Sequence, residues 1–66
     1  MTAQATPRHR VSATVARMRA DADSVADASV WSMDATETTA TLVQLSRLVA
    51  EATELEARVA AHADDL

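Results

Sequence analysis

The chain contains no glycine, and its single proline, Pro7, lies near the N-terminal residue. Without glycine, the sequence lacks the residue that most readily forms tight hairpin turns, phosphate-binding loops and dinucleotide-binding motifs. Proline is tolerated at or just before the first turn of a helix. The composition therefore predicts an all-α fold in which the one proline precedes the first helix.

The chain is short for a protein that has to stabilise its own core. Its 66 residues make at most one small domain, in a size range where a single core rarely stabilises a fold unaided. Hydrophobic residues make up 48% of the chain, but many of them are alanine, which buries little area. At roughly 1.5–3 kcal/mol for each larger side chain that is fully buried, the gain scarcely exceeds the entropy cost of ordering two helices. We therefore expect a partner, or a place in a larger helical domain or assembly.

Two segments have the spacing of apolar residues that is typical of amphipathic helices. The first is expected at about residues 9–27, where the stripe consists of Val11, Val15, Met18, Ala22 and Val25. The polar residues that follow favour local hydrogen bonds, which compete with the helix. Residues 1–8 are expected to form a disordered lead-in.

The second helix is expected at about residues 35–63. Asp34 precedes Glu37 by three residues, which resembles a capping box with Asp in place of Ser or Thr. Both acids also lie at the positive end of the helix dipole. Leu42 and Val49 widen the apolar stripe, as expected for a helix that packs against more than one neighbour. The a and d positions of the coiled-coil-like stripe are Leu45, Leu48, Ala52, Leu55, Val59, His62 and Leu66.

Two stripes joined by a short connection predict an antiparallel helical hairpin over residues 9–66, in which each helix covers one side of the other. Trp31 is the only aromatic residue and lies in the connection. An isolated tryptophan at such a turn most often closes one end of a small core, which is the role we favour. The alternative is an anchor for a partner surface. The residues predicted to pack or to bind a partner are Val11, Val15, Met18, Val25, Trp31, Leu42, Leu45, Leu48, Val49, Leu55 and Val59.

No combination of residues predicts catalysis. The absence of cysteine excludes disulfides, thiolate chemistry and most zinc sites, and a reducing cytoplasm is the simplest setting for such a chain. His9 and His62 lack the spacing of a metal-binding motif, and the serines have no flanking glycine or suitably spaced base. We expect no enzyme activity, no cofactor and no metal. No apolar run is long enough to predict a membrane span.

The net charge of −4 conceals an uneven distribution along the chain. Residues 1–20 contain arginines and no acid, whereas residues 21–66 contain all ten acidic residues. A solvated helix face with some pairing between the two halves is the simpler interpretation. The alternative is contact with anions such as nucleic-acid phosphates, although the arginines do not share one helix face and the acidic second helix would repel phosphates. The candidate anion contacts are Arg8, Arg10, Arg17 and Arg19.

Three short segments in the second half of the chain carry a resemblance to a known protein family. Trp31-Ser32-Met33 leads into Glu37-Thr38, the helical pattern continues from Leu42, and residues 55–64 read LEARVAAHAD. In these segments residues 25–66 resemble the N-terminal helical region of actinobacterial HNH endonuclease-type proteins, where a domain of unknown function precedes an HNH nuclease module. An HNH site needs histidines and an asparagine, often with zinc-binding cysteines, and this chain has neither asparagine nor cysteine. The resemblance therefore implies a helical fragment, or a truncated or free-standing relative, without the nuclease residues.

The sequence thus predicts a non-catalytic helical module that packs on further helices or on a second copy of itself. One alternative is a small regulatory or nucleic-acid-associated binding protein that uses the arginine-rich first helix. Another is a nuclease subunit that is completed by a second polypeptide.

Overall fold

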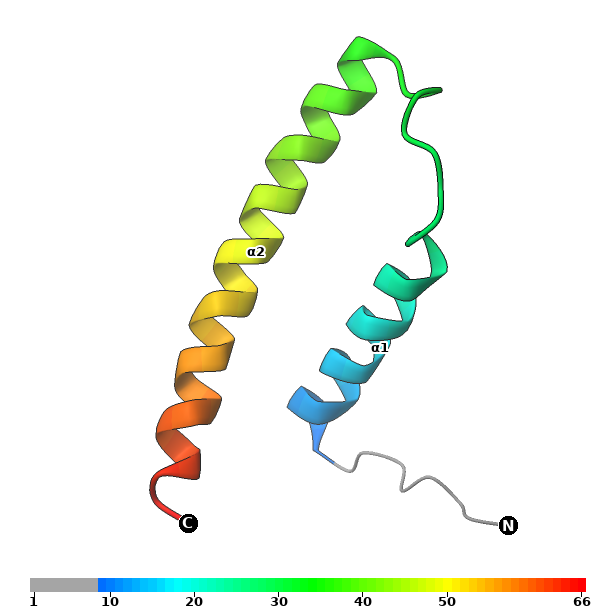
Figure 1. Ribbon diagram of the computed structural model, residues 1–66. Coiled ribbons are helices and arrows are strands. Elements are labelled where there is room, and N and C mark those ends of the chain that lie inside the picture. Colours follow the sequence, from blue (N-terminus) through cyan, green and yellow to red (C-terminus); the bar gives the residue numbers. More distant parts are fainter. Residues whose placement is uncertain (1–8) are drawn as a thin grey trace, which may run out of the picture. The chain divides into compact units, whose positions relative to one another are not determined.

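The computed structural model describes residues 9–66, so the expected lead-in at residues 1–8 lies outside the described residues. Within the described range the chain forms two α-helices and no strand: α1, Arg10–Ser24, and α2, Ala35–Ala63 (Figure 1). The prediction of an all-α chain with two helices is confirmed. The chain divides into two compact units, Met1–Val30 and Trp31–Leu66, and each is described by itself. Two helices joined by residues 25–34 are consistent with the expected hairpin, and the antiparallel packing of α1 on α2 within one domain stays a prediction.

The first helix ends earlier than its apolar pattern predicts, at Ser24 instead of about residue 27. The hydroxyl of Ser24 donates to the Asp21 carbonyl over 2.6 Å, and the Val25 N–H donates to the Ala22 carbonyl over 3.2 Å. Local bonds of this i to i+3 type close the last turn in place of the α-helical ladder. Val25, expected on the stripe of the helix, is its C-cap residue instead.

His9 is the N-cap residue of α1. Its Nδ1 accepts the Val11 N–H over 3.0 Å, which requires that this nitrogen carry no proton. Its carbonyl accepts the Ala13 N–H over 2.9 Å and the Ser12 hydroxyl over 3.0 Å. Histidine is not among the preferred N-cap residues, and α1 has no acid in its first turn and no base in its last. A helix of 15 residues with these ends is marginal by itself.

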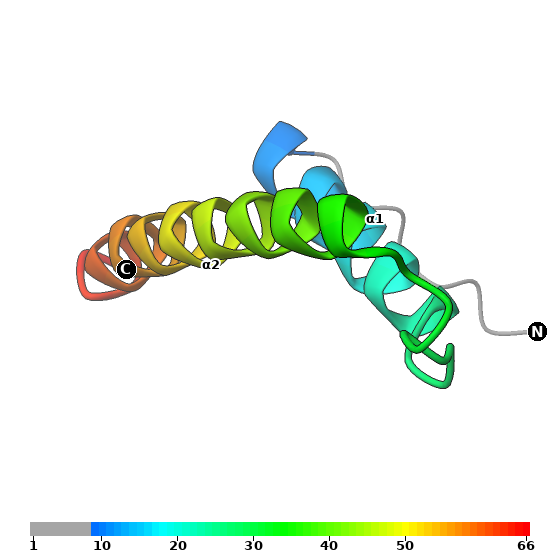
Figure 2. The same ribbon diagram turned by 90° about the horizontal axis from the view of Figure 1, so that it is seen from above.

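The second helix has the bounds that the sequence predicts, Ala35–Ala63, and its ribbon is continuous in both views (Figures 1 and 2). Asp34 is its N-cap residue, and Oδ1 of Asp34 accepts the Glu37 N–H over 2.7 Å. Glu37 in the first turn and His62 in the last both suit the helix dipole. With 29 residues at about 1.5 Å each, α2 is roughly 43 Å long.

None of the described residues is buried. Val11, Met18 and Leu55 are half-buried, and the other large apolar side chains of both helices are more exposed. Trp31 exposes 92% of its surface, so the role that we favoured for it, closing the end of a core, is not what the structure shows. Most of the large apolar side chains among residues 9–66 are therefore in contact with water.

Candidate functional site

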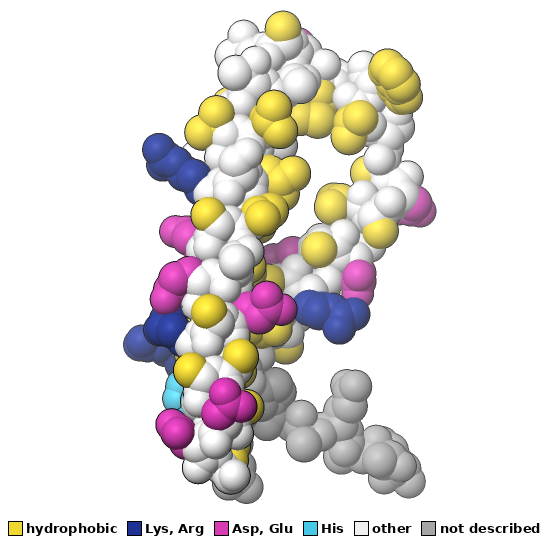
Figure 3. Space-filling view, turned by 60° about the vertical axis from the view of Figure 1, so that its left-hand side comes forward, with side chains coloured by type: hydrophobic (Ala, Val, Ile, Leu, Met, Phe, Trp, Pro, Cys, Tyr) yellow, Lys and Arg dark blue, Asp and Glu magenta, His cyan; other side chains and the backbone are white. Residues whose placement is uncertain are grey.

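The larger apolar side chains of α2 lie along one side of the helix. Residues three or four positions apart share a face because one turn takes 3.6 residues. In the space-filling view, larger hydrophobic side chains gather on one edge of the upper part of α2, arginine side chains lie on the other edge, and acidic side chains occur on both (Figure 3). We use the name α2 apolar face for the following residues: Leu42, Leu45, Leu48, Val49, Ala52, Leu55 and Val59.

This face is open to water along most of its length. Leu45 is 52% exposed and Leu48 is 44% exposed, in the middle of the face. A contiguous exposed apolar strip is typical of surfaces that contact other molecules, because covering it removes apolar area from water. Val43 is similarly exposed, at 49%, but lies on the opposite side of α2. It is therefore outside the face and serves as an internal control.

Charged residues flank the α2 apolar face at heptad spacing. On one flank Glu51 and Arg58 are seven residues apart, so they lie on the same side of the helix. On the other flank Glu56 follows Val49 by seven residues, so this flank changes from apolar to acidic toward the C-terminal end of α2. Arg58 also bonds within its own helix, since its Nε lies 2.8 Å from Oε2 of Glu54. Glu54 and Arg58 thus form an i, i+4 ion pair, and both of its side chains are well exposed.

A shallow, open hollow lies on the surface of α2. It is lined by Thr41, Gln44, Leu45 and Leu48, together with Arg47 and Glu51. The first four residues have the spacing i, i+3, i+4 and i+7. In coiled coils a hole of four such residues receives one side chain of the facing helix. The hollow therefore has the same residue spacing as such a hole.

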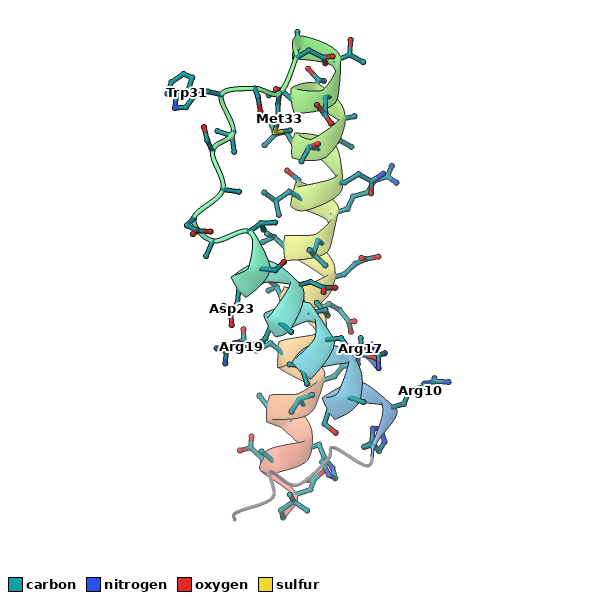
Figure 4. All side chains as sticks on the ribbon, turned by 90° about the vertical axis from the view of Figure 1, so that its right-hand side faces the viewer. Arg10, Arg17, Arg19, Asp23, Trp31 and Met33 are labelled. Atoms are coloured by element: carbon teal, nitrogen blue, oxygen red, sulfur yellow. The ribbon has the colours of Figure 1, made fainter. Side chains whose placement is uncertain are left out.

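The arginines of α1 do not form one basic patch. Arg10 and Arg17 project to one side of α1, and Arg19 projects to the side of Asp23 (Figure 4). Arg17 also donates from Nη2 to the Thr14 hydroxyl over 3.1 Å. Arg8, the remaining candidate anion contact, lies outside the described residues. The structure thus places two of the three described candidate anion contacts on one side of α1 and the third, Arg19, on another.

The predicted packing residues fall into three places in the structure. Those of α2 share the α2 apolar face, while Val11, Val15 and Met18 belong to α1. Val25 follows α1 directly, and Trp31 lies in the connection between the helices. The capping role of His9 escaped the sequence patterns, because histidine is not a recognised N-cap signal.

Among residues 9–66 no group of three or more histidine, cysteine or acidic side chains is placed to hold a metal ion. Neither of the two described helices combines the length and the hydropathy that crossing a bilayer requires. The α2 apolar face is thus the feature of the described residues that most clearly points to a role.

Comparison of the chain with protein families, with curated proteins and with solved structures finds no match. The resemblance to the helical region of HNH endonuclease-type proteins accordingly stays a prediction.

Proposed function

We propose that the protein is a non-catalytic helical interaction module that packs the α2 apolar face against another helix. The observation that carries the proposal is a continuous, exposed apolar face on a well-capped helix of 29 residues. Most of the stability of such a helix comes from packing its apolar face, because helix propensity alone contributes little. A partner helix supplies the burial that the single chain lacks.

The two helices contribute differently to this proposal. α2 has an acidic first turn and a histidine in its last turn, so it presents its face on a helix with favourable ends. α1 has neither feature and gains the most from any assembly that covers its own apolar side chains. We therefore propose that α2 provides the interface, and that α1 is stabilised where the assembly also covers its apolar side chains.

The same proposal accommodates the family resemblance. The helical region of HNH endonuclease-type proteins would correspond here to a packing element in the cytoplasm, with the nuclease chemistry absent from the chain. Nucleic-acid binding through α1 is not favoured by any arrangement of the described residues, because Arg10 and Arg17 lie on a different side of α1 from Arg19.

A concentration series tests the proposal. Molar mass from multi-angle light scattering and helicity from circular dichroism are measured together from micromolar to millimolar chain. We expect both to rise together, because assembly covers the α2 apolar face and stabilises the helices. A fully helical monomer at micromolar concentration contradicts the need for a partner.

A matched pair of variants shows whether the α2 apolar face is responsible. Leu45→Glu places a charge in the middle of the face, whereas Val43→Glu places the same charge on the opposite side of α2. Both introduce a good helix former, so helix propensity differs little between them. Association is expected to be lost in Leu45→Glu and retained in Val43→Glu.

A further inference from the structure

We infer that the α2 apolar face is built for α2 of a second copy of this chain running antiparallel, with Glu51 of each copy beside Arg58 of the other. The inference rests on the proposed function, that α2 packs against a helix, and adds the identity and direction of that helix. Three features of α2 carry it: the sizes of the facing side chains, the signs of the flanking charges and the position of the hollow.

The sizes of the side chains favour the antiparallel direction. In an antiparallel pair an a position faces a d position, whereas in a parallel pair in register each residue faces itself. Antiparallel pairing therefore places the small Ala52 against the larger Leu55. Parallel pairing places Ala52 against Ala52, which leaves unfilled space in that layer of the interface. It also places His62 against His62. The antiparallel layers are Ala52 with Leu55, Leu48 with Val59 and Leu45 with His62, each occurring twice by symmetry.

The flanking charges favour the same direction. Glu51 precedes the a-position residue Ala52, and Arg58 precedes the a-position residue Val59. In an antiparallel pair the residues at these preceding positions of the two helices lie on the same flank. Glu51 of one copy therefore lies beside Arg58 of the other. The two-fold symmetry repeats this pair, so two opposite-charge contacts form. In a parallel pair Glu51 lies beside Glu56 of the second copy, again twice, and both contacts are repulsive. Charges on these flanks are known to set the orientation of paired helices.

Arg58 can bind Glu54 of its own helix and Glu51 of the second copy at the same time. The 2.8 Å contact with Glu54 is made by Nε of Arg58. A guanidinium group has further N–H donors in a fixed fork, and in the proposed pair these donate to Glu51 of the second copy. Glu54 then holds the Arg58 side chain in place along its own helix, which reduces the entropy that Arg58 loses on binding.

The hollow on α2 is in register with this arrangement. Its four core residues, Thr41, Gln44, Leu45 and Leu48, surround the point on the helix that faces His62 of the second copy. A histidine at a d position is a defect in a dry parallel core, where it meets a second histidine. In the antiparallel pair the imidazole enters an open hollow near the end of the interface, and the polar residues Gln44 and Glu51 are among those that line it. The polar residue is thus accommodated where water still reaches it.

Charge reversal tests the inference in the full chain. Dissociation constants are measured by sedimentation equilibrium for the wild type, Glu51→Arg, Arg58→Glu, the double variant and a 1:1 mixture of the two single variants. Each single variant converts two attractive contacts into two repulsive ones, so we expect self-association roughly 10- to 30-fold weaker. The mixture is expected to form a heterodimer, and the double variant to recover association, because both restore opposite charges. At 1 M salt, where the Debye length is only about 3 Å, the differences should shrink.

The outcome for Glu51→Arg separates the two directions. In a parallel pair this substitution turns a repulsive contact between two glutamates into an attractive contact between the introduced guanidinium and Glu56. A tighter dimer of Glu51→Arg therefore overturns the antiparallel inference and leaves the proposed function intact. A wild-type chain that stays a fully helical monomer overturns both. Arg58→Glu alone also loses its bond to Glu54, and recovery in the double variant shows that this loss is not the cause of weakening.

Disulfide exchange gives a second readout of direction. The chain has no cysteine of its own, so Leu45→Cys and His62→Cys each introduce a single thiol. In a redox buffer, a 1:1 mixture of these variants is expected to yield mainly the mixed disulfide, because Leu45 faces His62 in the antiparallel register. The ratio of species is read by mass spectrometry. A predominance of the two homodimeric disulfides overturns the inference.

Discussion

Truncation of Leu48 to alanine gives the most quantitative test of the α2 apolar face. Leu48 lies in the middle of the face, and 44% of its surface is exposed in the single chain. The remainder is already covered within the chain, so a partner helix adds only the burial of the exposed part. Alanine has the higher helix propensity, so the substitution is expected to leave α2 itself helical.

The expected size of the effect follows from that exposure. Replacing leucine by alanine removes three carbon groups, worth together about 2.4 kcal/mol on full burial at about 0.8 kcal/mol each. Only the 44% that is exposed in the single chain becomes newly buried, which reduces this to about 1 kcal/mol for each copy. A symmetric pair contains the site twice, so the loss is about 2 kcal/mol, or roughly a 30-fold increase in the dissociation constant.

The assay is a dilution series followed by sedimentation equilibrium, and Val43→Ala is its control. Val43 has a similar exposed fraction, 49%, on the opposite side of α2. We expect Val43→Ala to change the dissociation constant by less than about twofold, since surface substitutions away from contacts have small effects. Equal effects of Leu48→Ala and Val43→Ala would refute the assignment of the interface to the α2 apolar face.

Three further predictions concern the helix ends and the arginines. Asp34→Ala should destabilise the first turn of α2 by about 1 kcal/mol, and Asp34→Asn by much less because the amide oxygen still accepts the Glu37 N–H. Helix populations from backbone chemical shifts at residues 35–38 measure both effects. Equal losses in the two variants would contradict the N-cap role of Asp34. His9→Asp should stabilise α1 by roughly 0.3–1 kcal/mol, because it places a carboxylate at the positive end of the helix dipole. Amide hydrogen exchange in α1 should then be slower. An unchanged exchange rate would show that the N-cap residue does not limit the stability of α1. Arg17→Ala combined with Arg19→Ala should leave the affinity for duplex DNA unchanged across a salt series, whereas a lost salt-dependent affinity would favour the nucleic-acid-binding alternative.

The bounds of α2 were predictable because the signals at its ends are local. The Asp34 carboxylate accepts a hydrogen bond from an amide only three residues away, so sequence spacing alone is enough to place it. No glycine or proline interrupts the segment that follows. The apolar face follows from the same spacing, since residues three and four apart must share a side of a helix. The positions of Glu51 and Arg58, which favour antiparallel pairing of two α2 helices, follow from the same spacing.

The end of α1 was predicted less well because it depends on a balance of comparable energies. The apolar stripe continues to Val25, but the Ser24 hydroxyl and the backbone near it form local bonds that stop the helix. Each such bond is worth about 1 kcal/mol, similar to the gain from one more helical turn. The N-cap role of His9 depends in the same way on the side-chain orientation that places Nδ1 at the Val11 N–H.

The sequence by itself determined that the described chain is helical, where α2 begins and ends, and which of its residues share a face. These properties arise from contacts within four residues along the chain, which spacing and residue type specify. Only the three-dimensional structure decided how far each apolar side chain is covered, including the 92% exposure of Trp31. Burial depends on residues distant in sequence, and an isolated tryptophan at a turn carries no signal of whether any of them will reach it.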